Sequence, residues 1–252
     1  MEKAVDSITI DNLNVSFQNT HVLKNITCRI PPNKITVIIG QSGCGKSTFL
    51  KSMNRIIEEE GGRHSGEIRL NGESIMDMPL ELLRKQVGLV FQTPVVFPFS
   101  VKKNMLYPLN YHYKLKDSEK AERITRYLKL VGLYDEVKGN LDIYASKLSG
   151  GQKQRLTIAR CLCIEPSLLM LDEPCSALDM GNTLLIESLL QKLKEFFTII
   201  TVTHDLSQAK RIADYVLFMD NGELVEANDK SIFSNPVKEL TKEYIKYMQY
   251  AG

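Results

Sequence analysis

The apolar positions of this 252-residue chain follow two periods in alternation, one of two residues and one of three to four, which is typical of an α/β fold. Strands are predicted where short apolar or alternating runs lie between turn residues: Ile8–Phe17, Cys28–Ile30, Ile35–Ile39, Val87–Phe91, Leu168–Leu171, Phe197–Thr203, and two hairpins over 66–72 and 215–227. Helices are predicted at 46–57 and 181–195. We expect the first two strands to belong to a small N-terminal sheet.

The pattern changes between about Thr93 and Arg160, where the strand signals vanish. Amphipathic stretches take their place, at about 101–107, 117–131 and 151–163. We therefore expect a single domain with a helical insertion. Its parts are an α/β core, residues 1–92 and 161–252, and an inserted helical subdomain, residues 93–160.

A glycine-rich loop follows the predicted strand 35–39 directly. Its glycines let the backbone curl until successive N–H groups point at phosphate oxygens, and the helix that begins here adds the positive end of its dipole. Lys46 is expected to reach the β- and γ-phosphates, and Ser47 to present its hydroxyl to Mg²⁺. The residues assigned to the nucleotide are Gly40, Gln41, Ser42, Gly43, Cys44, Gly45, Lys46, Ser47 and Thr48.

Two carboxylates, Asp172 and Glu173, follow the predicted strand 168–171. Ligands of open α/β sheets bind at the carboxyl ends of the strands. An isolated Asp-Glu pair would be interpreted as an acidic turn. With a phosphate loop upstream, Asp172 is interpreted as the carboxylate that orients Mg²⁺ and Glu173 as the base that polarises the attacking water.

Three further residues occupy strand ends that suit the same chemistry. Gln92 follows the strand 87–91, where its amide can contact the metal or the attacking water. His204 follows the strand 197–203, where its imidazole can hydrogen-bond the γ-phosphate. Phe17 is a candidate for stacking on an adenine ring, with ordinary core packing as the alternative.

A second anion-binding motif is predicted at residues 148–152, Leu-Ser-Gly-Gly-Gln, where a hydroxyl and flexible glycines precede a helix. One nucleotide cannot easily use both this motif and the phosphate loop. The sequence therefore presents two separate phosphate sites that need an explanation.

Composition excludes several classes of protein. The 32 Lys and Arg residues nearly balance the 30 Asp and Glu residues and form no basic run, so non-specific nucleic-acid binding is not indicated. The five cysteines include no C-x-x-C pair, which argues against a zinc site or a disulfide framework. No apolar run is long enough to span a bilayer, and Glu2, Lys3 and Asp6 interrupt any signal sequence. Any membrane role is expected to come through a partner.

The motifs G-x-x-x-x-G-K-S, Q, L-S-G-G-Q, L-L-M-L-D-E-P, S-A-L-D and T-V-T-H-D occur in the order that resembles the ATPase subunits of ABC transporters, over essentially the whole chain. The resemblance implies an α/β fold: a P-loop NTPase (RecA-like) core with an N-terminal antiparallel β subdomain and an inserted α-helical subdomain. It implies ATP and Mg²⁺ as cofactors.

The resemblance also implies partners. In this family two subunits pack head to tail, and each ATP lies between the phosphate loop of one and the signature loop of the other. Ser149, Gly151 and Gln152 would then contact the partner's nucleotide, and Asp179 would communicate across the interface. Two integral membrane permease subunits and, indirectly, an extracytoplasmic solute-binding protein are implied. The chain would lie peripherally on the cytoplasmic face of the membrane, with no nucleic acid as partner.

Within the family the chain is most similar to the ATPases of phosphate importers, a likeness carried by residues 91–100, 172–179 and 242–245. It departs from them at Phe17, where the family has a tyrosine. Ala145–Leu148 look more like the general importer pattern, so a polar amino acid importer is the alternative. The segment Thr93–Leu106 is apolar enough to predict a docking groove for a membrane-subunit helix, or else a satellite core.

Two other classes of protein are alternatives for the function of this chain. ABC-type ATPases that act on DNA or ribosomes carry a long coiled coil or tandem cassettes, for which 252 residues leave no room. A scaffold that binds ATP without hydrolysing it is opposed by the presence of Glu173 and His204.

Overall fold

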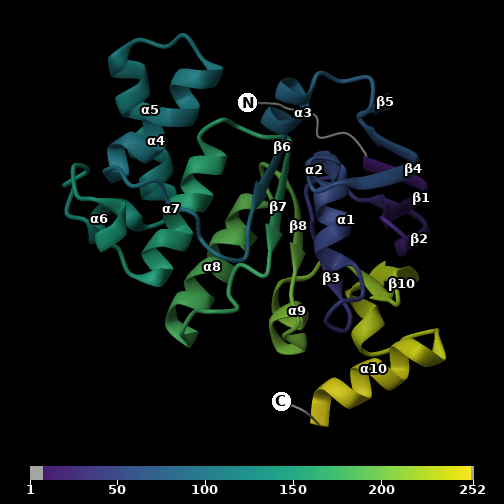
Figure 1. Ribbon diagram of the computed structural model, residues 1–252. Helices are drawn as coiled ribbons and strands as arrows, with labels where there is room; N and C mark the ends of the chain where they lie inside the picture. Colours follow the sequence, from purple (N-terminus) through teal and green to yellow (C-terminus); the bar gives the residue numbers. More distant parts are fainter. Residues whose placement is uncertain (1–7, 251–252) are drawn as a thin grey trace.

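The computed structural model describes residues 8–250, and the N-terminal residues considered above for a signal sequence lie outside that range (Figure 1). Its centre is a six-stranded sheet in the order β10-β9-β3-β8-β7-β6. Five strands are parallel and β10 pairs antiparallel with β9 at one edge. The strands are β3 (Ile35–Ile39), β6 (Val87–Val90), β7 (Leu168–Asp172), β8 (Thr198–Val202), β9 (Tyr215–Asp220) and β10 (Glu223–Asp229).

Every residue of β3, β7 and β8 is buried. Parallel strands covered on both faces are near-continuous apolar runs, interrupted here by the buried Thr36, Thr198 and Thr201, and this is why these three runs could be predicted from the sequence. Successive side chains still alternate between the two faces. Ile35, Val37 and Ile39 enter a core shared with helices, while Ile38 enters a second core shared with the N-terminal strands.

The second sheet is antiparallel, in the order β2-β1-β4-β5, and lies to the right in Figure 1. Its strands are β1 (Ile8–Phe17), β2 (Thr20–Ile30), β4 (Gly62–Leu70) and β5 (Glu73–Ser74). The predicted strand Cys28–Ile30 is only the end of β2, because polar residues separate the apolar positions Leu23 and Ile26 in the rest of that strand. The predicted hairpin over 66–72 turns on Asn71-Gly72 at the end of β4.

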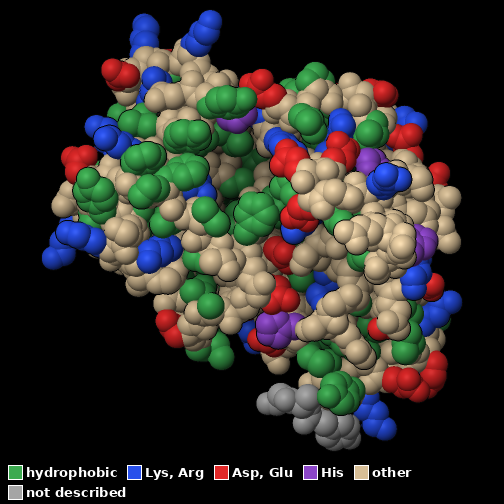
Figure 2. Space-filling model, viewed as in Figure 1, with side chains coloured by type: hydrophobic (Ala, Val, Ile, Leu, Met, Phe, Trp, Pro, Cys, Tyr) green, Lys and Arg blue, Asp and Glu red, His purple; other side chains and the backbone are tan. Residues whose placement is uncertain are grey.

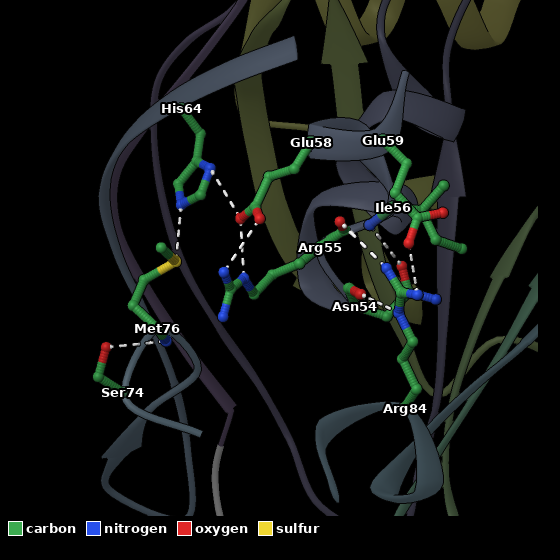
Figure 3. A network of polar contacts seen from close by, with 9 residues as sticks. All are labelled: Asn54, Arg55, Ile56, Glu58, Glu59, His64, Ser74, Met76 and Arg84. Atoms are coloured by element: carbon green, nitrogen blue, oxygen red, sulfur yellow. Dashed lines mark hydrogen bonds and ion pairs between the residues drawn. The ribbon is translucent and has the colours of Figure 1, made fainter. Parts of the chain in front are cut away.

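The predicted helix 46–57 is interrupted, and the polar contacts around the interruption are shown in Figure 3. α1 (Lys46–Met53) and α2 (Ile56–Glu59) are separated at Arg55, which has a left-handed φ of 59°. The guanidinium of Arg84, in α3 (Leu80–Gln86), donates to the carbonyls of Asn54 and Arg55 at 3.3 and 3.4 Å. A side chain from another element thus supplies donors to carbonyls at the end of the helix.

Helices fill the region where strand signals vanish, at the left of Figure 1: α4 (Val101–His112), α5 (Asp117–Leu130), α6 (Leu133–Glu136) and α7 (Gly150–Leu162). The subdomain boundary at residue 160 stays a prediction, and α7 runs two residues past it.

Three further helices pack against the large sheet: α8 (Met180–Leu193), α9 (Leu206–Ile212) and α10 (Glu239–Tyr250). Over residues 8–250, no helix combines the length and apolar character needed to cross a membrane.

Candidate active site

The phosphate loop connects the carboxyl end of β3 to the first residue of α1. Its glycines at 40, 43 and 45 all have positive φ, at 150°, 79° and 103°. A Cβ added at Gly45 would lie 2.6 Å from Leu23 Cδ2, and the φ of 103° is strained for any residue with a side chain. The predicted strand-loop-helix unit therefore has the geometry of an anion cradle.

Lys46 is buried although it is charged, with a relative exposure of 6%. Its ammonium donates to the carbonyls of Gly40 at 2.9 Å and Gln41 at 2.7 Å. A buried cation needs such partners, and these two belong to the loop itself. The charge is thus held inside the loop that the sequence assigned to phosphate.

Ser47 and Asp172 meet at the base of the same loop, with the Ser47 hydroxyl 3.1 Å from Asp172 Oδ1. Burial raises the pKa of the Asp172 carboxyl, and the hydrogen bond from Ser47 opposes that rise. In the part of the chain that the structure describes, no group of three His, Cys, Asp or Glu side chains is placed to hold a metal. Mg²⁺ needs no such cage, because it binds through one or two protein oxygens together with phosphates and water. Ser47 and Asp172 fit that requirement.

Glu173 joins the other two predicted strand-end residues. Its Oε2 lies 3.1 Å from Gln92 Nε2 and 3.0 Å from His204 Nδ1. Its φ is 44°, a left-handed value that is uncommon for a residue with a side chain. Its backbone N–H donates to Val202 of β8 at 3.1 Å, which holds the turn that β7 makes on leaving the sheet.

A cavity of about 450 Å³ brings these groups together. It is lined by Val22, Ser42, Gly43, Gly45, Lys46, Ser47, Thr48, Gln92, Glu173 and His204. Three strand ends far apart in the sequence thus open on the phosphate loop. Phe17 is not among the lining residues; its ring packs against Gly62, where an added Cβ would lie 2.8 Å from it. Stacking of Phe17 on adenine stays a prediction.

The signature motif lies outside this cavity, at the N-terminus of α7. The Ser149 hydroxyl accepts from the Gln152 backbone at 3.3 Å, and the Gln152 side chain accepts from the Ser149 backbone at 3.0 Å. Gln152 also donates to Glu136 at 3.0 Å. The two phosphate sites predicted from the sequence are therefore separate within one chain.

Asp179 is connected to the signature motif through a residue that the sequence analysis missed, Asn182. Asp179 accepts from the Asn182 backbone at 2.9 Å and from its amide at 2.6 Å. A Cβ added at Gly151 would lie 2.2 Å from the Asn182 amide oxygen. A side chain at Gly151 would have to displace the Asn182 amide, which Asp179 holds in place, so α8 lies close against this position of the motif.

Other missed residues carry weaker signals. Ser176 lies 3.3 Å from Gln92, and Val22 lines the cavity. Glu136 pairs with Arg155 of α7 at 2.7 Å. A hydroxyl in an acidic turn, a lone valine and an acidic residue in a short helix are too common in sequences to be singled out.

A phosphate loop with a buried Lys46, the Ser47–Asp172 pair and the Glu173 cluster lie at the carboxyl edge of a parallel sheet. Together they define a P-loop ATPase with an antiparallel β subdomain, and the predicted fold class is confirmed. A family model described as ABC transporter matches residues 23–176, more than half of the chain. The chain belongs to the ABC transporter family, as an ATPase.

Comparison with individual proteins agrees with this assignment. The chain is 42% identical over 243 residues to phosphate import ATP-binding protein PstB 1 of Vibrio parahaemolyticus, covering 95% of this chain and 89% of that protein. Its fold is similar to the ATP-binding cassette MJ0796 in a dimeric post-hydrolysis state bound to ADP and Pi, with a TM-score of 0.77, 27% identity, and coverage of 88% of this chain and 98% of that one.

A bacterial Atm1-family ABC exporter with ATP bound is also similar, with a TM-score of 0.83 and 25% identity. That match covers 100% of this chain and 43% of the exporter chain. The whole of this chain thus corresponds to less than half of the exporter chain.

Proposed function

We propose that this protein is the ATP-hydrolysing subunit of an importer, and that a head-to-tail dimer couples ATP binding and hydrolysis to solute import through partner membrane subunits. The observation that carries the ATPase role is the cavity in which Lys46, Gln92, Glu173 and His204 meet. Inorganic phosphate is the proposed solute, and its support is the 42% identity to a phosphate import ATP-binding protein.

The proposed chemistry uses the residues of the cavity in separate roles. Lys46 offsets the charge of the β- and γ-phosphates, and Glu173 accepts the proton of the attacking water. Gln92 and His204 both contact Oε2 of Glu173 and so fix the orientation of its carboxylate. Mg²⁺, when bound by Ser47 and Asp172, supplies charge neutralisation on the phosphate oxygens.

The proposed dimer answers the question raised by two phosphate sites in one chain. A nucleotide in the cavity of one subunit would meet Ser149, Gly151 and Gln152 of a second copy, and Asp179 would lie close to that interface. The dimeric state named for MJ0796 favours this arrangement for the present chain. We place the protein peripherally on the cytoplasmic face of the membrane, held there by permease subunits.

A groove of about 380 Å³ on the helical side is the proposed docking site for a permease helix. Apolar side chains gather over the helical region next to β6 (Figure 2). Val95 is 53% exposed and lines the groove together with Phe91, Phe97 and Tyr107. Phe99, in the segment predicted to dock, is exposed but does not line it. An exposed apolar surface of this kind is typical of a protein interface.

The groove is tested by replacing Val95 with Glu and measuring co-purification with the membrane subunits. We expect loss of the complex, because a carboxylate would enter an apolar interface, with ATP hydrolysis by the isolated chain retained. Val237→Glu, on an exposed surface elsewhere, is the matched control and should co-purify normally. An intact complex with Val95→Glu would remove the groove from the docking site.

The function as a whole is tested with the complex of this chain, its membrane subunits and their cognate solute-binding protein in liposomes. Mg-ATP hydrolysis should rise on adding phosphate, with phosphate uptake, and should vanish in Glu173→Gln. Stimulation by a polar amino acid and not by phosphate would assign the chain to amino acid import. ATP binding by the isolated wild-type chain without phosphate release would identify a nucleotide-gated scaffold instead.

A further inference from the structure

The C-terminal motif at residues 242–245 has no role in the proposed function, yet the helix that contains it is firmly attached. The carboxylate of Glu226 in β10 accepts from the backbone N–H groups of Val237 at 2.9 Å and Lys238 at 3.0 Å, just before α10 begins. α10 packs on α9 and β10, as Figure 1 shows. Over residues 239–249, its buried residues are Thr241, Tyr244 and Ile245, at the spacing of one helix face.

Tyr244 connects this face to the phosphate loop. Its ring stacks on Phe218 of β9, with 4.7 Å between centroids and 27° between planes. Phe218 pairs in register with Ile39, the last residue of β3, which directly precedes Gly40. The backbone of Gly40 acts on the phenol of Tyr244 and lowers its pKa, against the larger rise caused by burial. A residue near the end of the chain therefore packs beside the strand residues that lead into the loop.

Gly40 has little freedom to move away from these contacts. Its φ is 150°, and an added Cβ would lie 2.1 Å from the carbonyl oxygen of Met219. On the other side, its own carbonyl accepts from the Lys46 ammonium at 2.9 Å. The peptide at Gly40 is thus held between β9, Tyr244 and the cation of the loop, and a shift at one contact has to be accommodated at the others.

We propose that Tyr244 is a positioning residue for the phosphate loop: its ring on Phe218 and its hydroxyl on Gly40 fix the start of the loop and thereby its affinity for the phosphates of ATP. Tyr244 acts through Gly40 and does not touch the nucleotide. The proposal rests on the proposed role of the loop as the ATP site. Burial raises the pKa of Tyr244 to about 12, so the phenol is uncharged at neutral pH.

The decisive variant is Tyr244→Phe, which keeps the stacked ring and removes only the hydroxyl. We expect Kd and KM for ATP to rise about threefold to tenfold, the range that a neutral hydrogen bond spans, with kcat within about twofold of wild type. Backbone hydrogen exchange over residues 40–46, measured without nucleotide, should become faster. Tyr247→Phe is the matched control, because Tyr247 is 69% exposed on the same helix, and it should match wild type in all measurements.

Each result bears on the proposal separately from the proposed function. Unchanged exchange in Tyr244→Phe overturns the positioning role, even if the wild-type protein proved not to bind ATP. Wild-type ATP affinity in this variant also overturns it and reduces Tyr244 to core packing. A fall in kcat at constant KM would assign the residue to the chemical step and likewise contradict the proposal.

Discussion

Two helices of this chain present their N-termini to phosphate in the proposed mechanism, and they are capped differently. α1 begins after Gly45, which has a left-handed φ of 103°, and among the described residues no side chain caps it. α7 begins after Ser149, whose hydroxyl and the side chain of Gln152 form a closed capping box. The N–H groups at the start of α1 therefore bond to no capping side chain, whereas at the start of α7 the side chain of Ser149 already accepts a hydrogen bond from one backbone N–H group.

Because their N-termini are capped differently, the two helices are expected to bind phosphate in different ways. The N–H groups of α1 have no competing acceptor from a capping side chain, so this end is ready for an anion. At α7 a phosphate has to displace a cap worth about 1 kcal/mol or share its donors. We therefore expect the phosphate loop to bind ATP alone and the signature motif to engage only a nucleotide already held by a second subunit.

The largest expected effect is that of Lys46→Ala, which removes the cation from the ready site. ATP affinity should fall on the order of 100-fold, because charge-assisted hydrogen bonds to phosphate are lost, and turnover should disappear. Calorimetric titration measures the affinity directly. Lys192→Ala, an exposed lysine on α8, controls for the loss of a positive charge. Undiminished affinity with wild-type hydrolysis would refute the assignment of the loop.

Glu173→Gln should lower the hydrolysis rate about 10²- to 10⁴-fold while ATP affinity survives, because Asp172 remains and only the base is lost. ATP held between two copies should then stabilise a dimer, which light scattering with Mg-ATP detects. Glu195→Gln, exposed on the protein surface, is the control and should hydrolyse normally. Wild-type ATPase in Glu173→Gln would exclude it as the base.

Ser149→Arg separates the two helix ends most directly. In the Glu173→Gln background it should abolish the ATP-dependent dimer, because a bulky cation replaces the small hydroxyl, while the isolated subunit still binds ATP. Ser146→Arg, exposed and outside the capping box, should leave the dimer intact. Loss of ATP binding by the monomer would show that the two sites are not independent. Ser149→Ala alone should cost about 1 kcal/mol in the free energy of unfolding.

The smallest effect concerns the support of α7 by Glu136. The hydrogen bond from Arg155 holds the pKa of Glu136 below its usual value, and burial partly opposes this. A lowered carboxyl pKa contributes stability that is present above the unfolded pKa, near 4.5, and is lost as pH falls through the folded pKa. Glu136→Gln should therefore lower the free energy of unfolding by about 1 kcal/mol at pH 7, after discounting for solvent because Glu136 is exposed although Arg155 is buried.

Denaturant melts at several pH values measure this contribution. The difference between wild type and Glu136→Gln should shrink as pH falls below about 4.5, where the wild-type carboxylate takes up its proton. Asp142→Asn, exposed in the loop before α7, should show no such trend. A difference that stays constant with pH would mean that shape, and not charge, supports the signature helix.

The sequence by itself determined the features that depend on spacing along the chain. The buried run Ile35–Ile39, the three glycines and Lys46 specify a strand, a loop and a helix start in one short segment, and the structure has them there. The same holds for Asp172 at the end of β7. Each of these features depends on local backbone geometry and on the period of the apolar residues. Both can be recognised directly in the order of residues along the chain.

Only the tertiary structure decided which of these segments meet. Strand order places β3 next to β9, and this brings Tyr244, stacked on Phe218, beside the strand that leads into the loop. The fit of Asn182 against Gly151, and the packing of Phe17 on Gly62, likewise depend on how elements approach one another. Such contacts produce no recognisable pattern in the sequence, because the energy that selects them comes from packing between residues that are distant in sequence.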